Sequence, residues 1–177
     1  MKRIFVGVVA LMLLLCAALP VQAGAPLQGP IVKQKRPNVT LPGWAEFNIA
    51  ADTVNVRVPL RNSDKNTGWY DLAFELWAAL PKEAIQEGIE TKIMEEKDDL
   101  TGETRKVLYA KLLQTGMVKA GQYLQDVTLM QPVPAGTYSA IVYIQPYYVE
   151  TGLPTQINGG VGIRLNAICY GPDPVQK

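Results

Sequence analysis

The chain has 177 residues, with 17 Lys and Arg against 16 Asp and Glu, and it contains no histidine. This near-neutral balance argues against a nucleic-acid partner, because nucleic-acid binding requires clustered positive charge. The lack of histidine removes the commonest general base and the commonest transition-metal ligand. We therefore expect no enzymatic activity, no cofactor, no metal site and no nucleic-acid partner.

Residues 1–23 have the three parts of a cleavable secretory signal peptide. A positive start, Met1 to Arg3, precedes an almost unbroken apolar stretch at 4–19, and Val21-Gln22-Ala23 places small residues before a cleavage site. The apolar stretch is shorter than the roughly 20 residues that a membrane-spanning helix needs. We therefore predict an extracytoplasmic mature protein (secreted, on the cell surface or in the periplasm) that meets a membrane only during export.

The two cysteines limit how the fold is held together. Cys16 lies in the predicted signal peptide, and a lipidation site there is disfavoured because Leu15 replaces the small residue that should precede it. After cleavage, Cys169 is the only cysteine and has no partner for an internal disulfide. We expect Cys169 to be a small buried hydrophobe, the alternative being a free thiol that pairs between chains.

Residues 24–37 form a predicted extended arm that is rich in proline and glycine. The simpler interpretation is a tether to the folded domain. The alternative is an arm that adds a strand to a neighbouring subunit, for which Ile31 and Val32 provide an adjacent apolar pair.

From residue 39 onward, the alternation of apolar and polar residues predicts strands rather than helices. A turn cluster lies at 62–68, a short helical turn is expected at 82–88, and a short tail follows at 171–177. The predicted strands are a bulged edge strand over 39–49 broken by Pro42-Gly43, a half-buried strand over 54–60, a clear core strand over 70–77, a strand over 123–130, a central strand over 138–145 ended by Pro146, and a last strand over 161–167 opened by Gly159-Gly160.

A charged hairpin is predicted between the third and fourth of these strands. Its arms are 91–97 and 105–112, joined by a turn at 98–103. Glu95 and Glu96 on one arm can face Arg105 and Lys106 on the other, which stabilises the pairing by roughly 0.2–1 kcal/mol per pair. The charged character suggests that the hairpin projects into solvent.

Together these elements predict an all-β fold for residues 38–170, an antiparallel immunoglobulin-like β-sandwich of about seven or eight strands with a charged hairpin insertion. The segment Pro134-Ala135-Gly136-Thr137-Tyr138 resembles the approach to a strand in immunoglobulin and fibronectin type III-like domains where a tyrosine bonds back across the corner. That resemblance implies this role for Tyr138 and a core position for Leu129.

A wider set of segments resembles a group of small exported bacterial proteins of anaerobic Firmicutes that have no established biochemical role. The resemblance covers about 39–165 and implies the fold without an active site. The matching segments are Ala51-Asp52-Thr53, Tyr70-Asp71-Leu72-Ala73-Phe74-Glu75-Leu76, Ala135-Gly136-Thr137-Tyr138 and Gln145-Pro146-Tyr147.

Aromatic side chains are the candidate binding residues. Trp69 and Trp77 fall on the face of their strand opposite Tyr70, and Tyr147 and Tyr148 follow Pro146 at a strand end, where the binding loops of sandwiches gather. Core or rim packing is the alternative for all four.

Three functions remain open from the sequence. The leading hypothesis is an exported, non-enzymatic envelope or secreted module that binds a protein or glycan partner. The second is a structural subunit that assembles into a surface filament through its arm, as a homo-oligomer. The third, disfavoured, is a hydrolase that uses carboxylates such as Glu75 and Glu95.

Overall fold

The computed structural model describes residues 36–97 and 101–170. The predicted signal peptide, most of the arm, part of the hairpin turn and the tail lie outside the described residues. Two short 3-10 segments, η1 (Asp64–Asn66) and η2 (Lys82–Ala84), accompany the strands. The strands are β1 (Glu46–Ala50), β2 (Asn55–Arg61), β3 (Tyr70–Ala78), β4 (Thr91–Lys97), β5 (Thr104–Gln114), β6 (Tyr123–Thr128), β7 (Gly136–Tyr148) and β8 (Gly159–Ile168).

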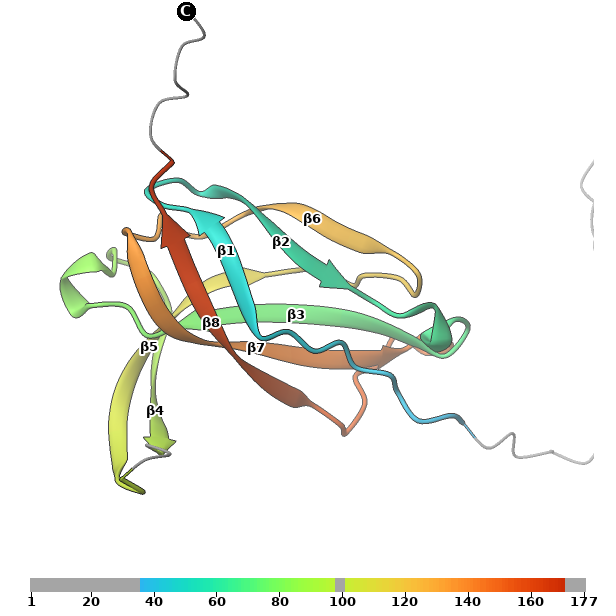
Figure 1. Cartoon of the computed structure of the whole chain (residues 1–177). Helices are drawn as coiled ribbons and strands as arrows, with labels where there is room; N and C mark the ends of the chain where they lie inside the picture. The colour runs from blue at the N-terminus through green and yellow to red at the C-terminus, as the bar shows by residue number, and fades with distance from the viewer. Residues whose placement is uncertain (1–35, 98–100, 171–177) are drawn as a thin grey trace, which may run out of the picture. The chain divides into compact units, whose positions relative to one another are not determined.

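These strands form two packed sheets. The larger sheet has the order β1-β8-β7-β3-β5-β4, and the smaller one pairs β2 with β6. Figure 1 shows β2 and β6 lying over one face of the larger sheet. All pairings are antiparallel except that of β1, which runs parallel to β8. The predicted immunoglobulin-like sandwich is therefore confirmed, with β1 as the one departure from antiparallel pairing.

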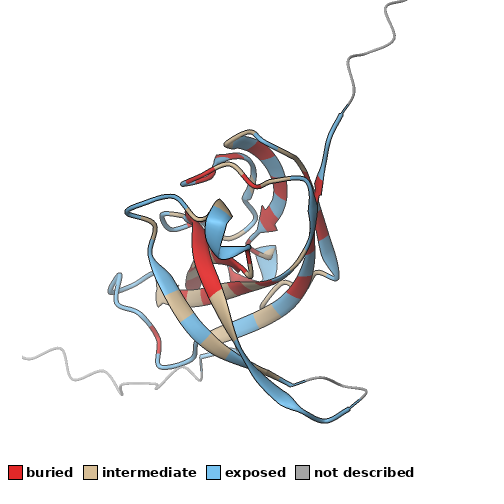
Figure 2. Ribbon diagram, turned by 90° about the vertical axis from the view of Figure 1, so that its left-hand side faces the viewer, coloured by how far each residue is buried: buried red, intermediate tan, exposed pale blue. Residues whose placement is uncertain are grey.

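The core lies between the two sheets and follows the period-2 alternation of the strands. On β3, the inward residues Leu72, Phe74 and Leu76 are at most 1% exposed. They meet Val56, Val58 and other aliphatic residues of β2, and Figure 2 shows the buried positions gathered inside the sandwich. Removal of these apolar surfaces from water is the main driving force of the fold.

The corner before β7 is built as expected. The Tyr138 hydroxyl donates a hydrogen bond to the Pro134 carbonyl at 3.1 Å, and Leu129 is buried in the core. A Cβ atom at Gly136 would lie 2.8 Å from the Tyr138 hydroxyl oxygen, so a glycine is needed where the ring folds back.

Two predicted strand boundaries were wrong, and each has a backbone reason. The first strand covers only Glu46–Ala50, because the segment before it is held by a side chain instead of a ladder. The Asn66 amide accepts from the Thr40 N–H at 2.9 Å and donates to the Thr40 carbonyl at 2.8 Å. Pro146 does not end β7. Its carbonyl accepts from the Thr155 N–H, on the side of β7 away from β3. Because the N–H and carbonyl of one strand residue point to the same side, the missing N–H of Pro146 also falls on that side and costs no hydrogen bond to β3.

Three smaller differences from the sequence prediction concern the helical turn, the end of β6 and Cys169. The helical turn is shorter than expected, covering Lys82–Ala84, and β6 ends at Thr128. Cys169 is exposed, which overturns its expected burial. It directly follows the last strand, at the point where the chain leaves the sheet.

Candidate functional site

The outer face of the larger sheet, the face away from β2 and β6, is covered in part by the β4–β5 hairpin. Figure 1 shows the hairpin projecting on that side of the sheet. The Lys92 ammonium, on β4, lies 4.0 Å from the ring centroid of Trp77 on β3 and 3.8 Å from that of Tyr143 on β7. The Tyr143 hydroxyl also donates to the Met94 sulfur at 3.3 Å. The edge strand β4 therefore reaches back across the outer face.

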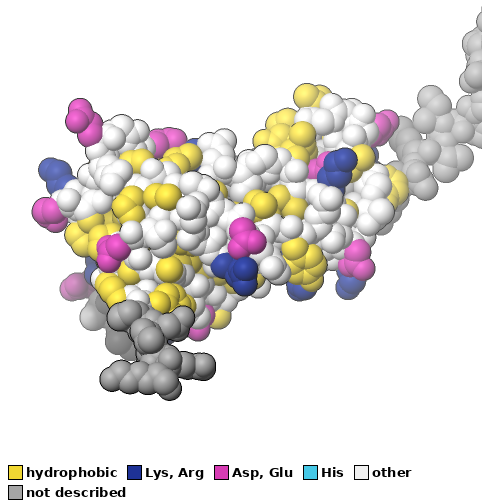
Figure 3. Space-filling view, turned by 90° about the horizontal axis from the view of Figure 1, so that it is seen from above, with side chains coloured by type: hydrophobic (Ala, Val, Ile, Leu, Met, Phe, Trp, Pro, Cys, Tyr) yellow, Lys and Arg dark blue, Asp and Glu magenta, His cyan; other side chains and the backbone are white. Residues whose placement is uncertain are grey.

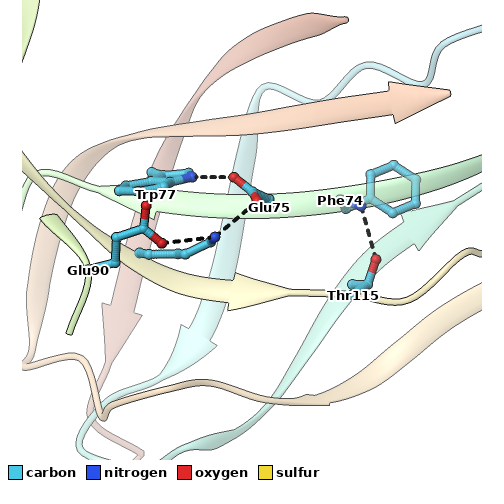
Figure 4. A network of polar contacts seen from close by, with 6 residues as sticks. Phe74, Glu75, Trp77, Glu90 and Thr115 are labelled. Carbon is cyan, nitrogen blue, oxygen red and sulfur yellow. Dashed lines mark hydrogen bonds and ion pairs between the residues drawn. The ribbon is translucent and has the colours of Figure 1, made fainter. Parts of the chain in front are cut away.

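A polar network fixes the base of the hairpin to β3 (Figure 4). The Lys111 ammonium lies 3.0 Å from one carboxylate oxygen of Glu75 and 3.1 Å from one of Glu90. The other Glu75 oxygen accepts from the Trp77 indole N–H at 3.0 Å. Both Glu75 oxygens and the buried Lys111 side chain are thus engaged within the protein.

This network determines which groups are charged. Partial burial would raise the pKa of Glu75, but hydrogen bonds from Trp77 and Lys111 outweigh it and lower that pKa below 4.5. Burial would lower the pKa of Lys111, yet the hydrogen bonds to Glu75 and Glu90 raise it above 10.5. Glu75 is therefore ionised at neutral pH and is unsuited to serve as a proton donor.

A second cluster lies nearer the hairpin turn. Glu96 accepts a short hydrogen bond from the Tyr109 hydroxyl and pairs with Arg105 at 2.8 Å. Burial would raise the pKa of Glu96, but these hydrogen bonds lower it, while burial and Glu96 raise the pKa of Tyr109. The predicted pairing of hairpin charges is therefore confirmed, and Glu95 lies opposite Lys106 as expected. One face of the hairpin covers Trp77, however, so it does not simply project into solvent.

A hollow of about 370 Å³ opens on the outer face beside Lys92, and we name it the Lys92 hollow. Its residues come from β3, β4, β5, β7 and the β7–β8 loop. Within the described part of the chain, four of its polar side chains have no hydrogen bond or ion pair to protein. They are Lys92, Gln114, Tyr147 and Asn158.

The structure separates the four aromatic residues that the sequence suggested. Tyr147 lines the Lys92 hollow. Trp77 is on the predicted face and only 2% exposed, beneath Lys92 and the hairpin, which is the core packing that the sequence also allowed. Tyr148 packs on Tyr70, with ring centroids 5.7 Å apart, beneath the Arg36 guanidinium. Trp69 is half-buried, and its carbonyl accepts from Val149 N–H.

Sequence reasoning missed Lys92, Gln114 and Asn158. The alternation along β4 places Lys92 on the same face as Met94 and Glu96, and this was the one available signal. The sequence gave no signal for Gln114 or Asn158, because an isolated amide side chain near a strand end belongs to no repeating sequence pattern. They line one hollow only in the folded protein, because they lie 44 residues apart in the sequence.

The carboxylate pair of the hydrolase hypothesis is not assembled. Glu75 points into the Lys92 hollow, whereas Glu95 alternates with Met94 and Glu96 and lies on the exposed side of β4. Two carboxylates on opposite sides of a hairpin cannot flank one bond. Among the described residues, no group of three or more His, Cys, Asp or Glu side chains lies close enough to hold a metal ion.

On the face seen in Figure 3, acidic and basic side chains are scattered and do not form a continuous basic field. In residues 36–97 and 101–170, no helix has the length and apolar character to cross a membrane.

No protein-family model matches the sequence, and no curated protein matches it. Among solved structures, the fold is similar to that of AggA, the major subunit of aggregative adherence fimbriae type I from Escherichia coli. The two chains are 13% identical, and the aligned part covers 74% of this chain and 95% of that one, with a TM-score of 0.33. These values are too low to assign a function.

Proposed function

We propose that this protein is an exported, non-enzymatic binding module that holds a glycan in the Lys92 hollow. The observation that carries the proposal is the ammonium of Lys92, held between two aromatic rings with no hydrogen-bond acceptor in the described structure. Export itself is supported by the predicted signal peptide. The resemblance to exported Firmicutes proteins agrees with this location and remains a prediction.

The chemistry of the hollow suits sugar hydroxyls. An ammonium offers three donors, the Gln114 and Asn158 amides offer donors and acceptors, and Tyr147 offers both a ring and a hydroxyl. Sugars present polar edges and apolar faces, and aromatic rings stack on the latter. Because Lys92 is already immobilised by Trp77 and Tyr143, a ligand would order few further bonds on binding.

A glycan array followed by calorimetry tests this function. The wild-type mature protein should bind at least one glycan class, and Tyr147→Ala should weaken that binding about tenfold or more. The matched control is Tyr123→Ala, since Tyr123 is 60% exposed on β6, on the other sheet. Absence of glycan binding by the wild-type protein, or equal binding by Tyr147→Ala, would contradict the proposal.

A surface-filament subunit is a second candidate, favoured by the open edge of β1. This strand pairs with β8 on one side, and no strand among the described residues pairs with its other side. A strand supplied by the arm of another copy could bond there. Light scattering on the mature protein with and without residues 24–37 separates the two functions, because only a filament subunit should form polymers that are lost when the arm is deleted.

A further inference from the structure

A second, larger hollow lies on the outer face, farther along β7. It has a volume of about 790 Å³ and lies among the hairpin, β7, β8 and the start of β1. We name it the Arg164 hollow. Its charged lining residues are Glu46, Glu96, Lys97, Arg105 and Arg164.

Two of these cations are unpaired in the described part of the chain. Arg105 is bound to Glu96, but the side chains of Lys97 and Arg164 have no hydrogen bond or ion pair to protein. In the Lys92 hollow, Lys111 is bound by both Glu75 and Glu90, so Lys92 acts on Glu75 only through space and keeps its hydrogen-bond donors. Each hollow therefore holds a cation that has no hydrogen-bonded carboxylate among the described residues, Lys92 in one and Arg164 in the other.

The two hollows follow one strand. Arg164 is paired with Ser139 of β7, and Gly160 is paired with Tyr143, the residue that lies over Lys92. Four residues of strand separate these two levels, a distance of about 13 Å.

Between the two hollows, no side chain of β8 stands above the sheet surface at Gly160 and Gly162, because both residues are glycines. A Cβ atom at Gly160 would come within 3.2 Å of Ile141 and 3.3 Å of Tyr143, and one at Gly162 would enter open space. Side chains at these positions would obstruct a ligand lying along the strand.

We propose that the glycan is an acidic polysaccharide, whose carboxylates reach Lys92 in one hollow and Arg164 in the other along the outer face of β7. This inference rests on the proposed function and names its ligand class. A guanidinium and an ammonium at a fixed separation suit a chain that repeats a carboxylate, because charge-assisted hydrogen bonds are stronger than neutral ones.

The test uses three uronate polymers, polygalacturonate, alginate and hyaluronate, with methyl-esterified galacturonan as a neutral polymer of the same sugar. Wild-type protein should bind at least one acidic polymer, and esterification should weaken binding to galacturonan about tenfold or more. Added salt should weaken the acidic interaction. Failure to bind any of the three, or equal binding of the esterified polymer, would overturn the inference.

Variants locate the contact. Arg164→Gln should weaken binding about fivefold or more, and Asn158→Ala should weaken it as well. Arg57→Gln, on β2 of the other sheet, is the charge-matched control and should bind as wild type does. Thermal unfolding of each variant verifies the fold. Equal binding by Arg164→Gln, or equally tight binding of poly-L-glutamate, would overturn the acidic-glycan assignment.

These results also distinguish failure of the acidic ligand class from failure of the proposed function. If neutral glycans bind and Tyr147→Ala abolishes that binding, the proposed function stands and the acidic ligand class falls. If no glycan of either charge binds, the proposed function falls with it.

Discussion

The two faces of the larger sheet bury side chains in different ways, although the same strands supply both. On the inner face, β3 presents Leu72, Phe74 and Leu76 to the aliphatic residues of β2 and β6. On the outer face, the same strand presents Glu75 and Trp77 to cations of the hairpin. Burial reaches a similar extent at Leu76 and Trp77, 1% and 2% exposed.

The difference shows which interactions depend on exact partners. Apolar burial is non-directional, so the inner face tolerates any well-filled set of hydrophobic side chains. A buried charge needs its own partner, so each cation of the outer face has a defined place. Lys111 is bound by two carboxylates, whereas Lys92 is held by two rings and keeps all three of its N–H donors for a ligand.

The largest expected effect comes from the inner face. Leu76→Ala should lower the free energy of unfolding by about 2–5 kcal/mol, because it leaves a cavity between the sheets. Urea denaturation measures this change. Ile93→Ala is the control, since Ile93 is 68% exposed on β4 and should change stability by less than about 0.5 kcal/mol. Equal effects at the two positions would remove the distinction between core and hairpin.

A smaller loss is expected on the outer face. Lys111→Met leaves Glu75 and Glu90 without their shared cation and should cost about 1–3 kcal/mol, below the range for fully buried pairs because both carboxylates are partly exposed. Adding Glu75→Gln to Lys111→Met should recover part of the loss, as a double-mutant cycle in urea would show. A strictly additive cycle would mean that the two side chains are not coupled.

The smallest effect is a change in acid sensitivity. The folded protein lowers the pKa of Glu75 below 4.5, so its ionised form contributes stability above that pH and loses it as the pH falls through the folded-state pKa. Glu75→Gln should therefore show a shallower fall in stability below about pH 4.5 than the wild-type protein. Denaturation midpoints measured across acidic pH test this, and identical slopes for both proteins would contradict it.

Lys111 provides the alkaline counterpart of this prediction. Its pKa is raised above 10.5 in the folded state, so its contribution is complete below that pH and is lost as the pH rises through the folded-state pKa. A shallower alkaline loss in Lys111→Met would confirm that the network is held by charge.

Sequence patterns predicted the frame of this molecule better than its site. The alternation of 54–60, 70–77 and 161–167 depends only on neighbours in the chain, so it marked β2, β3 and β8 within a few residues. The corner tyrosine was also predictable, because Tyr138 and its partner Pro134 are four residues apart. Of the four candidate binding residues, only Tyr147 lines the Lys92 hollow, whose other members come from distant strands.

By itself, the amino-acid sequence determined the strands, the turns, the charged hairpin and the all-β class, because each depends on local periodicity and backbone preference. The tertiary structure alone decided that Lys92 lies between Trp77 and Tyr143, that Trp77 is covered and that Cys169 is exposed. These outcomes depend on how the hairpin bends across the sheet. Contacts such as the ion pair between Lys111 and Glu75 hold the hairpin there. They join residues 36 positions apart, so the local sequence pattern does not reveal them.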